Sequence, residues 1–74
     1  MEKYLVCLDY GSGGIWRVVQ ADSKNSILTH YPELEIADVK PEWMSNQIYQ
    51  EYCNNPINLE DSSNKFFQAI LSQR

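Results

Sequence analysis

The feature that most constrains the fold is a pair of apolar runs joined by a glycine cluster near the N-terminus. Residues 4–22 read YLVCLDY-GSGG-IWRVVQAD. β-Branched and aromatic residues on both sides of a glycine-rich turn are typical of a β-hairpin. The sequence therefore predicts two antiparallel strands around which the rest of the chain is arranged.

The position of the turn sets the predicted register of this hairpin. A two-residue turn at Ser12 and Gly13, or a four-residue turn from Gly11 to Gly14, gives the same pairs. These pairs are Tyr10 with Ile15, Asp9 with Trp16, Leu8 with Arg17, Cys7 with Val18, Val6 with Val19, Leu5 with Gln20, Tyr4 with Ala21 and Lys3 with Asp22. The last pair carries opposite charges that attract across the strands.

Side chains alternate between the two faces of a strand, so the register divides the hairpin into two surfaces. The first face is predicted to be the core face and holds Tyr4, Val6, Leu8, Tyr10, Ile15, Val19 and Ala21, with Arg17 as its only charge. The second face holds Leu5, Cys7, Trp16 and Val18, flanked by Asp9, Gln20, Lys3 and Asp22. Its centre is too apolar for a plainly solvated surface. A bulge at the glycines would shift the register by one residue and exchange some assignments.

The rest of the chain reads as short elements separated by prolines and capping residues. A helix is predicted from about Lys24 to Tyr31, with Asp22 or Ser23 as its N-cap and Pro32 as its stop. Residues 34–39 alternate as a third strand, which pairs antiparallel with the first strand in the simplest topology. Residues 46–53 form an amphipathic helix after the capping Ser45, residues 57–59 a brief extended piece, and a last helix follows residues 61–63 and ends near Gln73.

These elements predict one α+β domain over residues 1–74, in the order ββαβαα. The expected architecture is a three-stranded antiparallel sheet of strand order 2-1-3 with three short helices. The pattern leaves open whether the helices cover one face of the sheet or both.

Composition narrows the classes of function. Six basic and ten acidic residues give a net charge of −4, which opposes binding to nucleic acid or to an anionic membrane surface. The longest apolar run, Tyr4 to Leu8, is far shorter than the roughly 20 residues of a membrane span. Two cysteines among nine aromatic residues do not resemble a disulfide scaffold, which favours reduced thiols and the cytoplasm.

No combination of side chains indicates catalysis. Phosphate-binding glycine loops open a helix, whereas residues 11–14 precede the strand residues Ile-Trp-Arg-Val-Val. His30 is the only histidine, and a general base also needs an orienting partner and a nucleophile within reach. A metal site made of His30, Cys7 and Cys53 would be assembled by chance. We therefore expect no catalytic residue, no metal and no cofactor.

The aromatic residues carry more functional interest. Tryptophan is enriched at binding hot spots, but it is also the largest core filler that a small domain has. Trp43 is predicted to be a core residue, whereas Trp16 fits the core and a binding surface equally well. If no helix covers the second face, Leu5, Cys7, Trp16 and Val18 form an interaction surface.

Four segments carry a resemblance to known proteins. They are Asp9-Tyr10-Gly11-x-Gly13-Gly14-x-Trp16, Ala21-x-Ser23, Tyr31-Pro32-Glu33-Leu34 and Pro41-x-Trp43-Met44. Over about the first 45 residues the chain resembles a group of small uncharacterised bacterial proteins with a Tyr-Gly-x-Gly-Gly-x-Trp hairpin. The resemblance implies a standalone cytoplasmic protein. It supplies no catalytic residue, because the group has no established activity.

The function expected from these observations is that of a protein–protein interaction module. The partner is a second copy of the chain or another protein that it assists or inhibits, and neither nucleic acid nor a membrane is expected. The alternative is a small-molecule binder or minor enzyme. Its cleft would be formed by Tyr10, Gly11, Gly13 and Gly14 of the turn together with His30 and Trp43.

Overall fold

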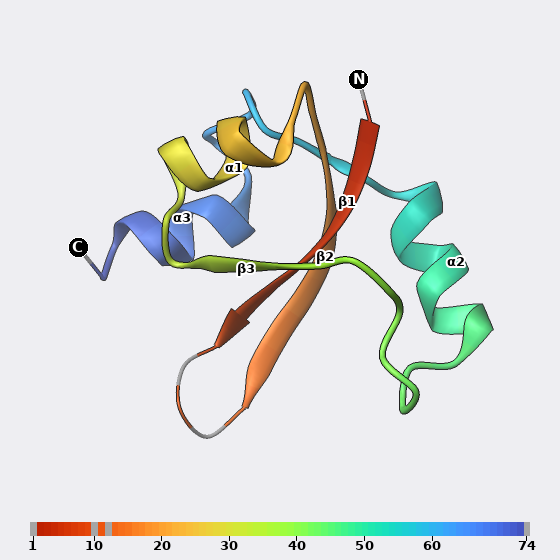
Figure 1. Cartoon of the computed structure of the whole chain (residues 1–74). Helices are drawn as coiled ribbons and strands as arrows, with labels where there is room; N and C mark the ends of the chain where they lie inside the picture. The colour runs from red at the N-terminus through yellow and green to blue at the C-terminus, as the bar shows by residue number, and fades with distance from the viewer. Residues whose placement is uncertain (1, 10, 12, 74) are drawn as a thin grey trace.

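A long hairpin forms the centre of the molecule. The computed structural model describes residues 2–9, 11 and 13–73. Strand β1 (Glu2–Asp9) pairs antiparallel with strand β2 (Gly14–Ala21), as the apolar runs predict. Figure 1 shows the two strands crossing the molecule, with the remaining elements on either side.

The register of the hairpin differs from the predicted one by two residues. Asp9 lies opposite Gly14, Ile15 lies opposite Leu8 instead of Tyr10, and Lys3 lies opposite Gln20 instead of Asp22. The strands are joined through residues 10–13 and not through residues 11–14. Because the shift is even, every residue keeps its predicted face. The two face assignments therefore hold for the described residues, although the predicted pairs are wrong.

The sheet has one more strand than the sequence predicts. Strand β3 (Leu34–Ala37) pairs antiparallel with β1, and the short strand β4 (Ile57–Asn58) pairs parallel with β2. In the described residues the sheet is thus mixed and four-stranded, in the order β3-β1-β2-β4. The predicted order 2-1-3 is present within it, but the predicted three-stranded antiparallel sheet is wrong. Two residues are too few to show an alternating pattern, so residues 57–59 read only as extended chain.

Three short helices occur in the described part of the chain, each beginning after a polar N-cap. They are α1 (Lys24–His30), α2 (Asn46–Asn54) and α3 (Lys65–Leu71). Ser23, one of the two predicted caps, begins α1, and Ser45 caps α2 as predicted. Helix α3 is capped by Asn64, one residue beyond the predicted 61–63. Each cap side chain accepts a hydrogen bond from a backbone N–H of the first turn. None of these helices has the length and apolarity needed to cross a membrane.

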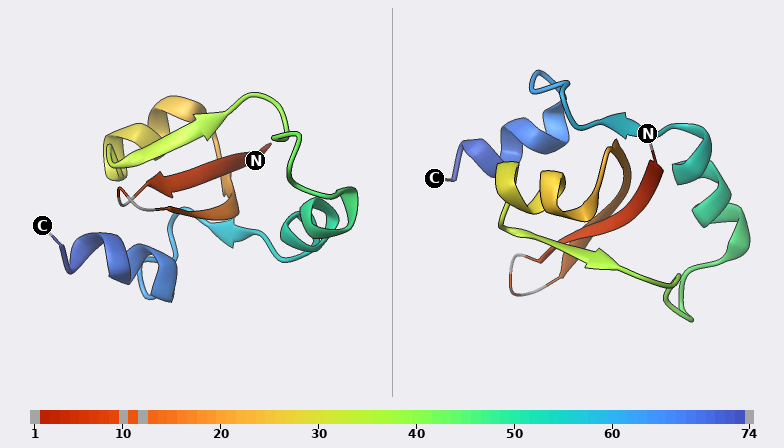
Figure 2. Two further views of the ribbon diagram at one scale, coloured as in Figure 1. Left: turned by 90° about the horizontal axis from the view of Figure 1, so that it is seen from below. Right: turned by 45° about the horizontal axis from the view of Figure 1, so that its top comes forward.

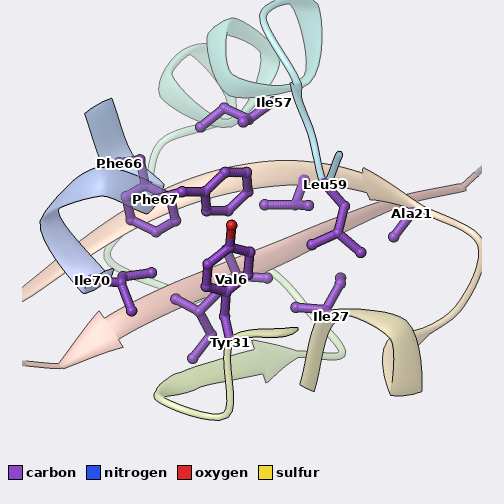
Figure 3. Close-up of a cluster of buried hydrophobic side chains, with 11 residues drawn as sticks. Val6, Ala21, Ile27, Tyr31, Ile57, Leu59, Phe66, Phe67 and Ile70 are labelled. Carbon is purple, nitrogen blue, oxygen red and sulfur yellow. The ribbon is translucent and has the colours of Figure 1, made fainter. Parts of the chain in front are cut away.

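The helices cover both faces of the sheet. Helices α1 and α3 lie on one side of the β1–β2 hairpin and α2 lies on the other (Figures 1 and 2). The larger core fills the side of α1 and α3. Its buried residues are Val6, Val19, Ala21, Ile27, Tyr31, Leu34, Ile57, Leu59, Phe66, Phe67 and Ile70. Figure 3 shows this cluster, in which the rings of Tyr31 and Phe67 stack with centroids 4.4 Å apart.

Candidate functional site

The second face of the hairpin is covered within the chain. Leu5, Val18 and Met44 form a small buried cluster there, and Cys7 is also buried. Partly buried side chains of α2 pack against this cluster, namely Tyr49, Tyr52 and Cys53. The expectation of an uncovered surface at Leu5, Cys7 and Val18 is therefore wrong. An amphipathic helix later in the chain covers the apolar centre that motivated it.

Trp16 is the member of that predicted surface that stays partly exposed. Its ring meets the ring of Trp43 edge to face, with centroids 5.5 Å apart and an interplanar angle of 73°. Trp43 is 66% exposed, so its predicted place in the core is wrong. The neighbouring Met44, only 1% exposed, takes the core position instead. We call Trp16 and Trp43 the tryptophan pair.

The glycine turn has two different requirements for glycine. Gly11 has a φ of 96°, a left-handed conformation that favours glycine, and its N–H donates to the Asp9 carboxylate at 2.8 Å. Gly14 lies in β2, where a Cβ atom would come within 2.8 Å of the Cys7 Sγ. The need for positive φ therefore explains Gly11, whereas close packing explains Gly14. Tyr10, which was predicted to line the same turn, lies outside the described residues.

The predicted ligand cleft does not form from the residues assigned to it. His30 ends α1 on one side of the sheet, whereas Trp43 packs on Trp16 on the side of α2. The sheet separates these two side chains. His30 Nδ1 lies 2.8 Å from the Ser26 carbonyl oxygen. A cavity of about 110 Å³ lies beside His30 and has room for only a few water molecules. Its other lining residues are Gln20, Ala21, Asp22, Ser26, Asn58, Leu59 and Glu60.

The thiols lie on the side of α2. Burial raises the pKa of the Cys7 thiol, and the nearby carboxylates of Glu35 and Asp9 raise it further. A raised pKa keeps this thiol protonated and weakly nucleophilic. Cys53 is partly buried, and its hydrogen bond with Tyr49 raises the pKa of that phenol. Among residues 2–9, 11 and 13–73, no group of three or more His, Cys, Asp or Glu side chains is arranged to hold a metal ion.

Two cations donate to backbone carbonyls in the segments that carry the tryptophan pair. The Arg17 guanidinium donates to the Trp16 carbonyl oxygen at 2.6 Å and lies 5.7 Å from the centre of the Tyr52 ring. Lys40 Nζ donates to the Met44 carbonyl oxygen at 2.6 Å. The sequence pattern placed Arg17 on the first face and did not indicate that it reaches a helix on the other side.

Sequence reasoning missed the exposure of Trp43. The sequence feature that bears on this exposure is the pair Trp43-Met44. Neighbouring side chains in an irregular segment point in different directions, so only one of the two enters the core. The sequence does not say which. No family model, no curated protein and no solved structure matches this chain in the comparisons with known proteins.

Proposed function

We propose that this protein is a protein–protein interaction module whose contact surface is centred on the tryptophan pair. The observation that carries the proposal is the 66% exposure of Trp43, in a chain that buries most of its other large apolar side chains. Removing an indole from water is favourable, and tryptophan is among the residues enriched at binding hot spots.

The packing of the pair supports the same function. Trp43 is held against Trp16 by an edge-to-face contact before any partner arrives. A side chain that is already ordered loses less conformational entropy on binding, so more of its contact energy contributes to affinity. The partner is another protein that this chain assists or inhibits, or a second copy of the chain.

A comparison of exposed apolar side chains tests the proposal. Trp43→Ala removes the exposed ring, and Leu28→Ala is the matched control because Leu28 is 40% exposed on α1, on the other side of the sheet. We expect partners captured by the wild-type chain, or a dimer seen by light scattering, to be lost in Trp43→Ala and kept in Leu28→Ala. Equal capture and equal mass for all three proteins would contradict the proposal.

The state of the thiols bears on where such a module works. Cys7 and Cys53 are both free, which fits a reducing compartment. We propose the cytoplasm on this ground. Thiol titration of the protein as purified under anaerobic conditions should find both cysteines reduced, and a mixed or intermolecular disulfide would argue for another compartment.

A further inference from the structure

Two carboxylates share the sheet face of Trp16, and a third directly precedes Trp43 in the chain. Cys7 lies directly opposite Trp16 in the hairpin, and Asp9 and Glu35 are close enough to Cys7 to act on its titration. The register places both carboxylates on the same face as Trp16, because Asp9 is two residues from Cys7 and Glu35 lies opposite Cys7 in β3. Glu42 directly precedes Trp43 in the chain. All three of these acidic side chains are exposed.

Most cations of the described residues make an internal contact, and so do some of the acids, such as Asp9 with the Gly11 N–H. Lys24 pairs with Asp38, and Lys3, Arg17 and Lys40 each donate to a backbone carbonyl. All ten acidic side chains are exposed, and the formal net charge is −4. The field that an approaching molecule meets is therefore negative, which favours a basic partner over a second copy of this acidic chain.

We infer that the tryptophan pair binds a basic segment of another protein, with an arginine or lysine side chain stacked on the Trp43 ring and flanked by Asp9, Glu35 and Glu42. This inference rests on the proposed function and specifies the chemistry of its partner. An indole face attracts a cation through its quadrupole, and arginine stacks on it better than lysine because its guanidinium is planar and weakly hydrated.

The two cations in the segments of the pair do not cancel this preference. Arg17 and Lys40 are directed at the carbonyl oxygens of Trp16 and Met44, and Arg17 also lies over Tyr52. Both cations keep their charge, but the three carboxylates outnumber them, and Asp9 also accepts the Gly11 N–H. The surface is therefore suited to a cationic side chain and poorly suited to an anionic one.

The test uses the full chain and four dye-labelled peptides of one length. They share a Gly-Ser spacer and carry Arg, Lys, Gln or Glu at the repeated third position. Dissociation constants come from fluorescence anisotropy at an ionic strength of about 0.15 M, where long-range attraction is screened. The expected order of affinity is Arg, then Lys, then Gln, then Glu. Trp16 and Trp43 are the only tryptophans in the chain, so a change in intrinsic fluorescence on adding the Arg peptide reports binding at the pair.

Three variants locate the binding. We expect Trp43→Ala and Glu42→Gln each to weaken binding of the Arg peptide about two- to fivefold, the size of an exposed cation–π or ion-pair contact. Glu60→Gln is the charge-matched control, because Glu60 lies beside the His30 cavity on the other side of the sheet, and it should leave binding unchanged. Thermal melts of all variants confirm that they are folded.

Two outcomes would overturn the inference. One is an Arg peptide that binds no more tightly than the Gln peptide, and the other is an equal loss in Glu60→Gln and Glu42→Gln, which would mean attraction to net charge alone. These outcomes do not decide the proposed function, which the Trp43→Ala capture experiment tests separately. A protein partner that requires Trp43 but prefers neutral or acidic peptides removes the basic-partner inference and leaves the interaction module in place.

Discussion

The two faces of the sheet are built from alternate residues of the same strands, yet they differ in depth. On the side of α1 and α3, eleven buried residues form one cluster, and α3 alone contributes Phe66, Phe67 and Ile70. On the side of α2 the buried cluster has three residues, and α2 has no buried residue among those described. The side of α1 and α3 therefore carries most of the stability. On the other side, α2 covers the apolar residues of the strands only partly.

The two sides differ in what they contribute to stability and in what they leave exposed. Burial of apolar area stabilises the folded state by about 25 cal/mol per Å², so the deeper cluster contributes more. The thinner side leaves Trp43 at the surface beside a covered sheet. Folded domains have a net stability of about 5–15 kcal/mol. Because most apolar burial lies on the side of α1 and α3, we expect the exposed indole of Trp43 to contribute little to it.

The largest expected effect is on the deep side. Phe67 is fully buried, and its ring stacks on Tyr31 at a 5° interplanar angle. Phe67→Ala should lower the free energy of unfolding by about 3–5 kcal/mol, because it removes a large apolar side chain and leaves a cavity. Urea denaturation followed by circular dichroism measures the change. A loss below about 1 kcal/mol would remove the distinction between the two sides.

A smaller loss is expected for the buried residue of the thin side. Met44 is 1% exposed, but its surroundings include the partly exposed Trp16, Tyr49 and Tyr52, which can close over a vacated space. Met44→Ala should lower the free energy of unfolding by about 2 kcal/mol, at the low end for such truncations. The same urea titration, run beside Phe67→Ala, gives the ranking. A larger loss for Met44→Ala than for Phe67→Ala would reverse it.

Close packing at the hairpin end gives a third effect. Gly14→Ala would place a methyl group 2.8 Å from the Cys7 Sγ, so the buried thiol must move. We expect a loss of about 1–2 kcal/mol, typical of overpacking. In the Cys7→Ala background the same substitution should cost less, because the sulfur is gone. A double-mutant cycle measures this coupling, and strict additivity would mean that Gly14 is required for another reason.

The smallest effect on stability is expected at the exposed ring. Trp43→Ala removes the edge-to-face contact with Trp16 but little buried area, so the free energy of unfolding should fall by about 1 kcal/mol or less. Chemical denaturation followed by far-ultraviolet circular dichroism avoids dependence on the lost fluorophore. A loss as large as that of Phe67→Ala would make Trp43 a structural residue and weaken its assignment as a contact residue.

The parts of the fold that could be predicted are those with a local cause. The alternation in β1 and β2, the serine caps of α1 and α2, and the stop at Pro32 each follow from neighbouring residues. The register could not be predicted, because the glycine-rich stretch accommodates a turn at more than one position, and the close packing of Gly14 against Cys7 is a cross-strand contact that local sequence does not show. Strand β4 was missed because its pairing with β2 is a long-range event.

The candidate site was predicted only in part, for a related reason. Trp16 was recognised from its face of the hairpin, and it does remain partly exposed. Its partner Trp43 was assigned to the core because a small domain needs bulky core residues, and nothing local shows that Met44 takes that position instead. Whether the second face was covered depended on where α2 packs, and that is decided by tertiary contacts with Leu5 and Val18.

The place of Arg17 has a consequence for how this protein behaves at high concentration. Strand β4 pairs only with Val19 and Gln20, so the N-terminal half of β2 is an open edge of the sheet. Such an edge is a template on which another chain can add a strand and begin an aggregate. The Arg17 guanidinium caps the Trp16 carbonyl on β2 and brings a charge to that strand. We expect this charge, and the occupied carbonyl, to disfavour the addition of a strand from another molecule at this edge.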